Sequence, residues 1–175
     1  NVPAIDRKAG LEQAVAESGG KVQLLDFQVG DWASSKAFAI TQAYLTRFGD
    51  DIKGIWAAND EMALGAIQAL TAEGLNGRIK VCSIDGTPPA LDAITSGDLV
   101  CSDSWDPYRW GGLALSLAYK AAAGEYTPSS EGNERREFYG KTALIDSSNV
   151  DQFKSGAPEI DYDAVWDFVG AQIRA

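Results

Sequence analysis

Short apolar runs alternate with segments of helical periodicity along most of this chain. The runs are rich in Val, Ile, Leu and aromatic residues, and they extend from Val22 to Phe27, Ile52 to Ala58, Ile79 to Ile84 and Asp98 to Ser102. Between them, from Ser34 to Arg47 and from Glu61 to Glu73, apolar residues recur at spacings of three and four. This alternation predicts right-handed βαβ units and an α/β fold built on a doubly wound parallel sheet.

Helix boundaries are marked by capping residues. Asp60 is expected to cap one helix, and Gly74 to end it. Thr87, followed by a proline, is expected to open the next helix, which Gly97 ends.

Polar and aromatic residues follow each apolar run. They are Asp31-Trp32, Asn59-Asp60-Glu61, Ser83 to Thr87, and Asp103-Ser104-Trp105. If the runs are parallel strands, these residues converge on one edge of one sheet. Open α/β sheets bind ligands outside the carboxyl ends of their strands, so the sequence predicts a site for a small polar molecule there.

The chain begins with a helix rather than a strand. Apolar residues on one face predict a helix from about Ile5 to Glu17, before any strand. The first strand of a doubly wound sheet is usually central, and exposing the middle of a sheet leaves backbone groups unpaired. We therefore expect this chain to be a piece of a longer protein, with residues upstream of Asn1 completing the sheet.

Composition narrows the classes of partner. The 175 residues are 45% hydrophobic and carry a formal net charge of −10. This charge disfavours nucleic acid and anionic membrane surfaces, which need basic patches, and no apolar run is long enough to span a bilayer. The chain has no histidine and two cysteines, so neither a metal site nor a cofactor is expected.

The two cysteines, Cys82 and Cys101, fall in neighbouring predicted strands. An oxidising compartment would permit a disulfide, although adjacent parallel strands rarely orient both side chains for one. A bridge and a pair of buried thiols both remain open.

Adjacent acids raise the question of catalysis. Asp50-Asp51 and Asp60-Glu61 are pairs that a hydrolase or a phosphoacceptor could use. The chain has no histidine, phosphate-binding glycine loop or nucleophile elbow, and neighbouring acids usually point apart. We expect no catalytic residue, and we interpret Asp60 and Glu61 as favourable charges at a helix start and Met62 as a core residue.

Three sequence blocks resemble one family. Asp6 to Leu11, Trp56 to Ala66, and Ser83 to Pro88 are similar to blocks of the periplasmic sugar-binding proteins of the ribose-binding type. The resemblance runs from residue 1 to about residue 151. It implies two α/β lobes joined by three crossovers, of which this chain holds the carboxyl-terminal lobe, without its first strand and most of the other lobe.

The resemblance also implies polar binding residues. Arg7 matches an arginine whose planar fork donates to sugar hydroxyls. Asn59 matches an amide that both donates and accepts, and Asp85 matches a carboxylate that accepts from adjacent hydroxyls.

Two tryptophans complete the expected site. Trp32 lies where the family places an aromatic ring against the sugar. Trp105 replaces the glutamine of ribose-binding proteins, which predicts a ligand other than ribose. Asp103 shares a face with Trp105 only if the strand persists that far.

The resemblance divides the chain into three parts. Residues 1–105 are the ligand-binding lobe, and 106–139 are a crossover segment that packs with the amino-terminal lobe. Residues 140–175 hold the third crossover and a terminal helix. Within these parts we expect a helix from Pro107 to Ala123, a strand from Thr142 to Asp146 and a helix from Asp161 to Ile173.

The expected function is that of a periplasmic, or extracellular and membrane-tethered, solute-binding protein. It would bind a monosaccharide or sugar alcohol between two lobes and deliver it to the membrane permease of an ABC transporter. The alternative is the effector-binding domain of a lactose-repressor-type transcription regulator. The sequence preceding Asn1 would separate the two, because an export signal favours transport and a helix-turn-helix favours regulation.

Overall fold

The computed structural model describes residues 2–105, 107–127 and 142–155. These residues form a mixed α/β fold. The elements follow in the order α1 (Val2–Glu17), α2 (Ser34–Phe48), the 3-10 helix η1 (Gly49–Asp51), β1 (Gly54–Trp56), α3 (Asp60–Ala72), β2 (Lys80–Asp85), α4 (Pro88–Ser96), β3 (Cys101–Ser104), α5 (Pro107–Ala122), β4 (Ala143–Asp146) and α6 (Val150–Lys154).

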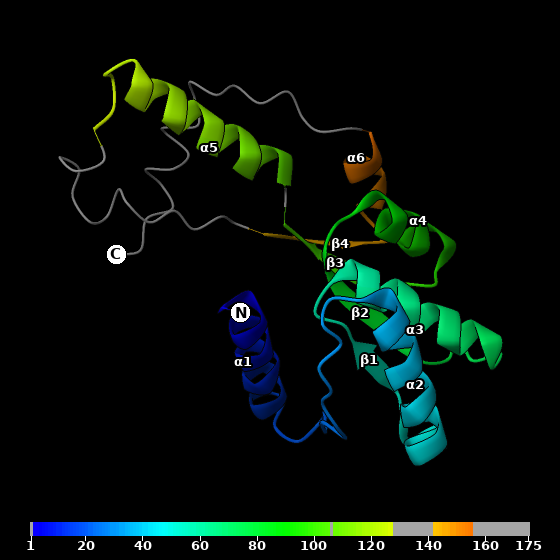
Figure 1. Cartoon of the computed structure of the whole chain (residues 1–175). Coiled ribbons are helices and arrows are strands. Elements are labelled where there is room, and N and C mark those ends of the chain that lie inside the picture. The colour runs from blue at the N-terminus through cyan, green and yellow to red at the C-terminus, as the bar shows by residue number, and fades with distance from the viewer. Residues whose placement is uncertain (1, 106, 128–141, 156–175) are drawn as a thin grey trace.

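The strands form one sheet in the order β1-β2-β3-β4. β1, β2 and β3 are parallel to one another, and β4 runs antiparallel to β3. Right-handed crossovers that step in the same direction keep their helices on one face. Accordingly α3 and α4 are in contact, and α2 packs beside α3 (Figure 1). The predicted α/β fold is therefore confirmed.

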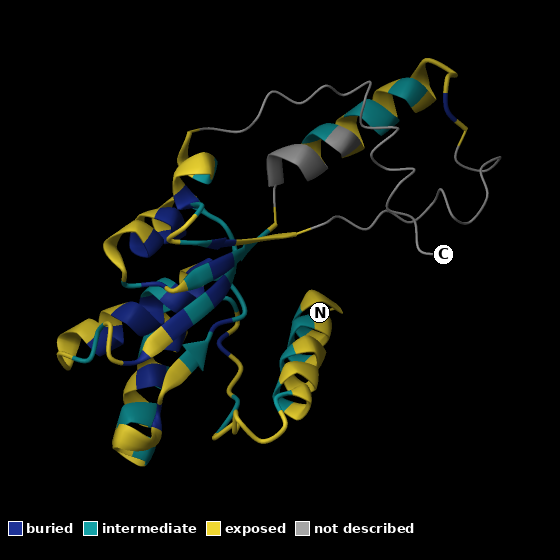
Figure 2. Ribbon diagram, turned by 180° about the vertical axis from the view of Figure 1, so that it is seen from behind, coloured by how far each residue is buried: buried dark blue, intermediate teal, exposed yellow. Residues whose placement is uncertain are grey.

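The hydrophobic core lies between the sheet and this helical layer. Leu70 of α3 and Ile94 of α4 are no more than 2% exposed, as are Val81 of β2, Ile145 of β4 and the neighbouring Leu99. Figure 2 shows the buried residues gathered there. The core thus fixes the positions of β2 and β3, whose carboxyl ends carry predicted site residues.

Helices α2 and α3 approach closely at Gly65. A Cβ added there would lie 2.2 Å from the backbone oxygen of Ser34, so a side chain would push the helices apart. Alanine normally stabilises a helix interior by about 1 kcal/mol relative to glycine. Here we expect Gly65→Ala to lower the free energy of unfolding by about 1–3 kcal/mol in chemical denaturation.

Gly10 of α1 is the matched control, because a Cβ there meets no atom within 4 Å. Gly10→Ala should leave the stability unchanged or raise it by up to about 1 kcal/mol. A Gly65→Ala variant at least as stable as the parent protein would contradict the close packing of α2 on α3.

One predicted strand is wrong. The run from Val22 to Phe27 has no regular secondary structure and passes beside β1 without joining the described sheet (Figure 1). Other contacts hold it: Lys8 lies 5.4 Å from the ring centroid of Phe27, and Arg47 forms a 2.9 Å ion pair with Asp26. An apolar run favours an extended backbone, but it does not by itself establish the hydrogen-bonded pairing that defines a strand of a sheet.

Helix α1 stands apart from the helical layer, with β1 between α1 and α2 in both views (Figures 1 and 2). It confirms the predicted helix from Ile5 to Glu17, and no residue of it is buried. The remaining predicted helices and strands are present with small shifts of their ends, except Asp161 to Ile173, which lies outside the described residues.

A search of the described residues finds no helix with the length and apolar character needed to cross a bilayer.

Candidate functional site

The carboxyl ends of three neighbouring strands carry predicted site residues. Asn59 lies three residues beyond β1, Asp85 ends β2, and Trp105 follows β3 directly. The backbone N–H of Trp105 donates a 3.1 Å hydrogen bond to the carbonyl oxygen of Asp85. The topology therefore brings these residues to one edge of the sheet, as the sequence predicts.

Arg7 reaches this edge from α1. Its Nη2 lies 3.1 Å from Oδ1 of Asp85, and its Nη1 donates to the carbonyl oxygen of Ala58. The guanidinium carbon lies 5.4 Å from the ring centroid of Trp32, within cation–π range. One side chain thus joins α1, the loop after β1, the end of β2 and the segment before α2.

Asn59 is held by its role at the start of α3. It is the N-cap residue, and its Oδ1 accepts a 3.0 Å hydrogen bond from the backbone N–H of Met62. The cap is therefore Asn59 rather than Asp60, which corrects the sequence-based prediction. Its Nδ2 donates to no group in the described part of the chain, so the capped amide can still donate to a ligand.

Burial raises the pKa of Asp85 above its ordinary value of 3.8. The Arg7 guanidinium opposes this rise through its charge and hydrogen bond, whereas the nearby Asp60 carboxylate adds to it. The side chains of Arg7 and Asp85 are 20% and 29% exposed. Asp85 is therefore a partly desolvated carboxylate with one counter-charge, positioned to accept hydrogen bonds from hydroxyl groups.

Unfavourable backbone conformations are concentrated at this site. Over residues 2–105, 107–127 and 142–155, the non-glycine residues with positive φ are Asp31 (48°), Trp32 (61°) and Asp85 (132°). Such conformations cost about 1–3 kcal/mol each and persist where the surrounding structure imposes them. They occur at two of the five predicted binding residues, and no sequence pattern indicates them.

Asp60 is a buried carboxylate that connects the elements around the site. Its side chain is fully buried and accepts from Oγ of Ser83 at 2.5 Å and from Oγ of Ser102 at 2.7 Å. It also accepts from the backbone N–H and Oγ1 of Thr87 at 2.7 and 2.9 Å. One carboxylate therefore ties the start of α3 to β2, β3 and the loop that follows Asp85.

The sequence contained a signal for this network that our interpretation of Asp60 missed. Ser83 and Ser102 are direct partners in the register of β2 and β3. Both occupy positions that face the apolar helical layer, where each hydroxyl requires a hydrogen-bond partner. Two serines at equivalent places in neighbouring buried strands point to a buried polar group between them.

β3 ends at Ser104, so the alternation that would place Asp103 beside Trp105 does not extend that far. Trp105 itself is 46% exposed. Its backbone joins the site through the hydrogen bond to Asp85, whereas Asp103 lies opposite Ile84 in the sheet.

The adjacent acids do not form a common site. Asp60 is buried and Glu61 is exposed, as expected for neighbours on a helix, and Met62 joins the core. Among the described residues, no cluster of three or more His, Cys, Asp or Glu side chains could hold a metal ion. Cys82 and Cys101 are free thiols.

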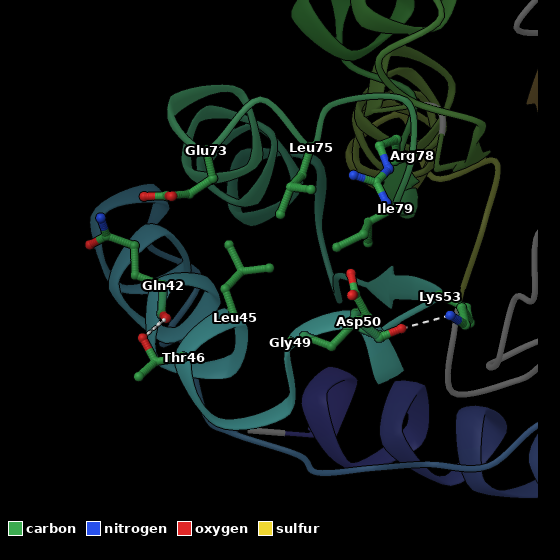
Figure 3. A pocket seen from close by; sticks show the side chains of 11 residues that line it. Gln42, Leu45, Thr46, Gly49, Asp50, Lys53, Glu73, Leu75, Arg78 and Ile79 are labelled. Atoms are coloured by element: carbon green, nitrogen blue, oxygen red, sulfur yellow. Dashed lines mark hydrogen bonds between the residues drawn. The ribbon is translucent and has the colours of Figure 1, made fainter.

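A cavity of about 460 Å³ lies at the opposite end of the sheet. Leu45, Asp50, Lys53, Glu73 and Arg78 are among its lining residues (Figure 3). Lys53 precedes β1 and hydrogen-bonds the backbone oxygen of Asp50, so the cavity borders the amino ends of the strands. It contains none of the predicted binding residues, and ligands of open α/β sheets bind at the carboxyl ends. The carboxyl edge is therefore the better candidate site.

Comparison with known proteins is consistent with this geometry. Residues 2–126 match the periplasmic binding protein domain. The ribose import binding protein RbsB of Salmonella typhimurium is 34% identical over 122 residues, which are 70% of this chain and 40% of that protein.

Two solved structures are also similar to this chain. A twin-arginine translocation pathway signal protein from Burkholderia phytofirmans has a TM-score of 0.89 and 46% identity, covering 100% of this chain and 53% of that one. The Caulobacter myo-inositol binding protein, solved with myo-inositol, has a TM-score of 0.76 and 27% identity, covering 85% and 48%. The chain thus spans about half the length of these proteins, or less. It belongs to the periplasmic binding protein family.

Proposed function

We propose that this chain is the carboxyl-terminal ligand-binding lobe of a solute-binding protein for a monosaccharide or sugar alcohol. The observation that carries the proposal is the arrangement around Arg7. A guanidinium, a partly buried carboxylate and a capped amide share one edge of the sheet, with Trp32 against the guanidinium and Trp105 beside Asp85.

This set of groups suits a polyhydroxylated ligand. Each sugar hydroxyl donates and accepts, and the carboxylate of Asp85 supplies acceptors while Arg7 and the Nδ2 of Asn59 supply donors. The faces of Trp32 and Trp105 suit the apolar C–H face of a sugar ring. Among the described residues, no nucleophile lies beside a base that would activate it, so the proposal assigns binding and no catalytic step.

The remainder of the same protein would supply the amino-terminal lobe. In this proposal residues 1–105 form the carboxyl-terminal lobe, 106–139 cross over to pack with the other lobe, and 140–175 hold the third crossover and a terminal helix. A ligand that contacts both lobes favours the closed state by its differential affinity. The closed shape would then dock on the membrane permease of an ABC transporter.

Export from the cytoplasm is part of the proposal. The family is named for periplasmic proteins, and the Burkholderia relative is described as a twin-arginine translocation pathway signal protein. We propose a periplasmic or extracellular, membrane-tethered location. The charge of −10 accords with a partner that is not nucleic acid.

A thermal-shift screen of the intact protein against pentoses, hexoses and polyols tests the proposal. A ligand that binds only the folded state raises the unfolding temperature. We expect at least one sugar or polyol to do so, and the shift to be lost in Asp85→Ala. An equal shift in the variant would overturn the proposed site. No shift with any compound would also overturn it, and would leave the effector-binding domain of a transcription regulator as the alternative.

Binding should weaken as the pH falls. Hydroxyl groups bond more strongly to the ionised Asp85, and the raised pKa of Asp85 brings its protonation above the ordinary 3.8. Affinity should therefore be constant near neutral pH and decline as the pH approaches this raised pKa. Calorimetric titration at several pH values measures the profile, with Asp85→Asn as the control that should lose this dependence. A decline of equal size in Asp85→Asn would place the titrating group elsewhere.

A further inference from the structure

Two cysteines lie side by side in the sheet. Cys82 of β2 and Cys101 of β3 are direct partners in the parallel register, and both are free and partly exposed. Neighbouring strands lie about 4.8 Å apart, and partner residues project from the same face. The two thiols therefore form a cross-strand pair rather than two separate cysteines.

This pair occupies the sheet face that the helical layer leaves open. The alternating positions Val81, Ser83 and Ser102 are buried toward α3 and α4, whereas the cysteines between them are partly exposed. In the same row of the sheet, Trp56 of β1 is opposite Cys82 and Asp146 of β4 is opposite Cys101. Both cysteines are thus outside the apolar core.

The surroundings distinguish the two thiols. Burial raises the pKa of Cys101 to about 12, assisted by a hydrogen bond to Cys82 and by the charges of Cys82, Asp146 and Asp103. Cys101 therefore keeps its proton at neutral pH and can donate it toward the Cys82 sulfur. The first attack on an oxidant is therefore placed at the Cys82 sulfur rather than at Cys101.

We propose that Cys82 and Cys101 are an oxidation-sensitive dithiol that a small disulfide oxidant converts into a cross-strand disulfide. The Cys82 sulfur, losing its proton to solvent, attacks one sulfur of the oxidant, which forms a mixed disulfide and expels one thiolate. The Cys101 sulfur, losing its proton to solvent, then attacks the Cys82 sulfur and expels the second thiolate. The protein loses two electrons and two protons, and the oxidant is reduced to two thiols.

The first step makes the second step easier. Once Cys82 is in the mixed disulfide, its charge can no longer contribute to the raised pKa of Cys101. The strands must also draw together, because disulfide Cβ atoms lie about 3.8 Å apart and neighbouring strands about 4.8 Å apart. The resulting strain makes the bond easy to reduce again.

The test is oxidation of the reduced, intact, folded protein by oxidised glutathione at mildly alkaline pH, followed by mass spectrometry and peptide mapping. We expect the parent protein to lose two hydrogen atoms, about 2 Da, with Cys82 linked to Cys101 and no retained glutathione. Added dithiothreitol should restore the original mass.

Two single variants separate the steps. Cys101→Ser should stop at a stable glutathione adduct on Cys82, whereas Cys82→Ser should react much more slowly. Circular dichroism checks that both variants remain folded, and native-state thiol titration of the parent protein before and after oxidation gives a readout that needs neither variant. Unreacted thiols, a lasting adduct on the parent protein, or links only between two molecules would overturn the proposal.

Discussion

Replacement of Asp60 by alanine is expected to cause the largest loss of stability of any substitution considered. The variant removes an acceptor that is 1% exposed and leaves the donors of Ser83, Ser102 and Thr87 without a partner. Hydrogen bonds to a charged group contribute about 1.5–3 kcal/mol each, and an orphaned buried donor costs about 1–3 kcal/mol. Because these contributions overlap, we expect the free energy of unfolding to fall by about 3–5 kcal/mol in denaturant titrations monitored by tryptophan fluorescence.

Glu61 is the matched control, because it is the next acid along the same helix and is exposed. Glu61→Ala should change stability by no more than about 0.5 kcal/mol. Asp60→Asn should also destabilise the protein, since its amide nitrogen cannot accept the hydrogen bonds that a carboxylate oxygen of Asp60 accepts from Thr87. An Asp60→Ala variant as stable as Glu61→Ala would show that the network contributes little.

Replacement of Arg7 by alanine is expected to cause the largest loss of ligand affinity, provided that the sugar-binding proposal holds. The variant loses donors to the ligand and also the contacts of Arg7 with Asp85, Ala58 and Trp32. Asp85 would then be a partly buried carboxylate without its counter-charge, which favours its neutral form. We expect the dissociation constant to rise by about 30-fold or more, equivalent to about 2 kcal/mol.

Lys8 is the matched control for charge on α1. It is the adjacent cation and pairs with Glu12 on the exposed surface, so Lys8→Ala should leave affinity nearly unchanged. Arg7→Lys keeps the charge but loses the planar fork, and it should fall between the parent protein and Arg7→Ala. Calorimetry with the ligand found in the screen measures all three variants. Equal affinities of Arg7→Ala and Lys8→Ala would remove Arg7 from the binding site.

The sequence was sufficient for the elements whose signals are local. Helices α2, α3 and α4 follow from apolar spacing and from boundary residues such as Gly97, which adopts the left-handed conformation after α4. β2 follows from the apolar run Ile79 to Ile84, whereas β3 (Cys101–Ser104) is mostly polar and begins three residues later than the run from Asp98 to Ser102 predicts. The run from Val22 to Phe27 has the same local signal, yet its state depends on contacts with α1 and Arg47 that no local pattern encodes.

The same distinction between local signals and long-range contacts applies to the residues of the candidate site. Topology places Asn59, Asp85 and Trp105 at one edge, so the strand order was enough to bring them together. Arg7 required the family resemblance, because it reaches this edge of the sheet from α1, which is not part of the sheet or of the helical layer. The role of Asp60 was missed because its partners lie 23 to 42 residues away along the chain, and the paired serines of β2 and β3 were the one sequence signal for it.

The positive φ of Asp85 carries a consequence for how far this protein can be stabilised. Glycine would adopt the same backbone conformation without the strain of about 1–3 kcal/mol that aspartate incurs. The substitution Asp85→Gly would therefore relieve strain and discard the desolvated carboxylate in the same change. Under the proposed function, selection for thermal stability alone would favour variants that no longer recognise the ligand, so tolerance of heat and recognition of sugar compete at this one position.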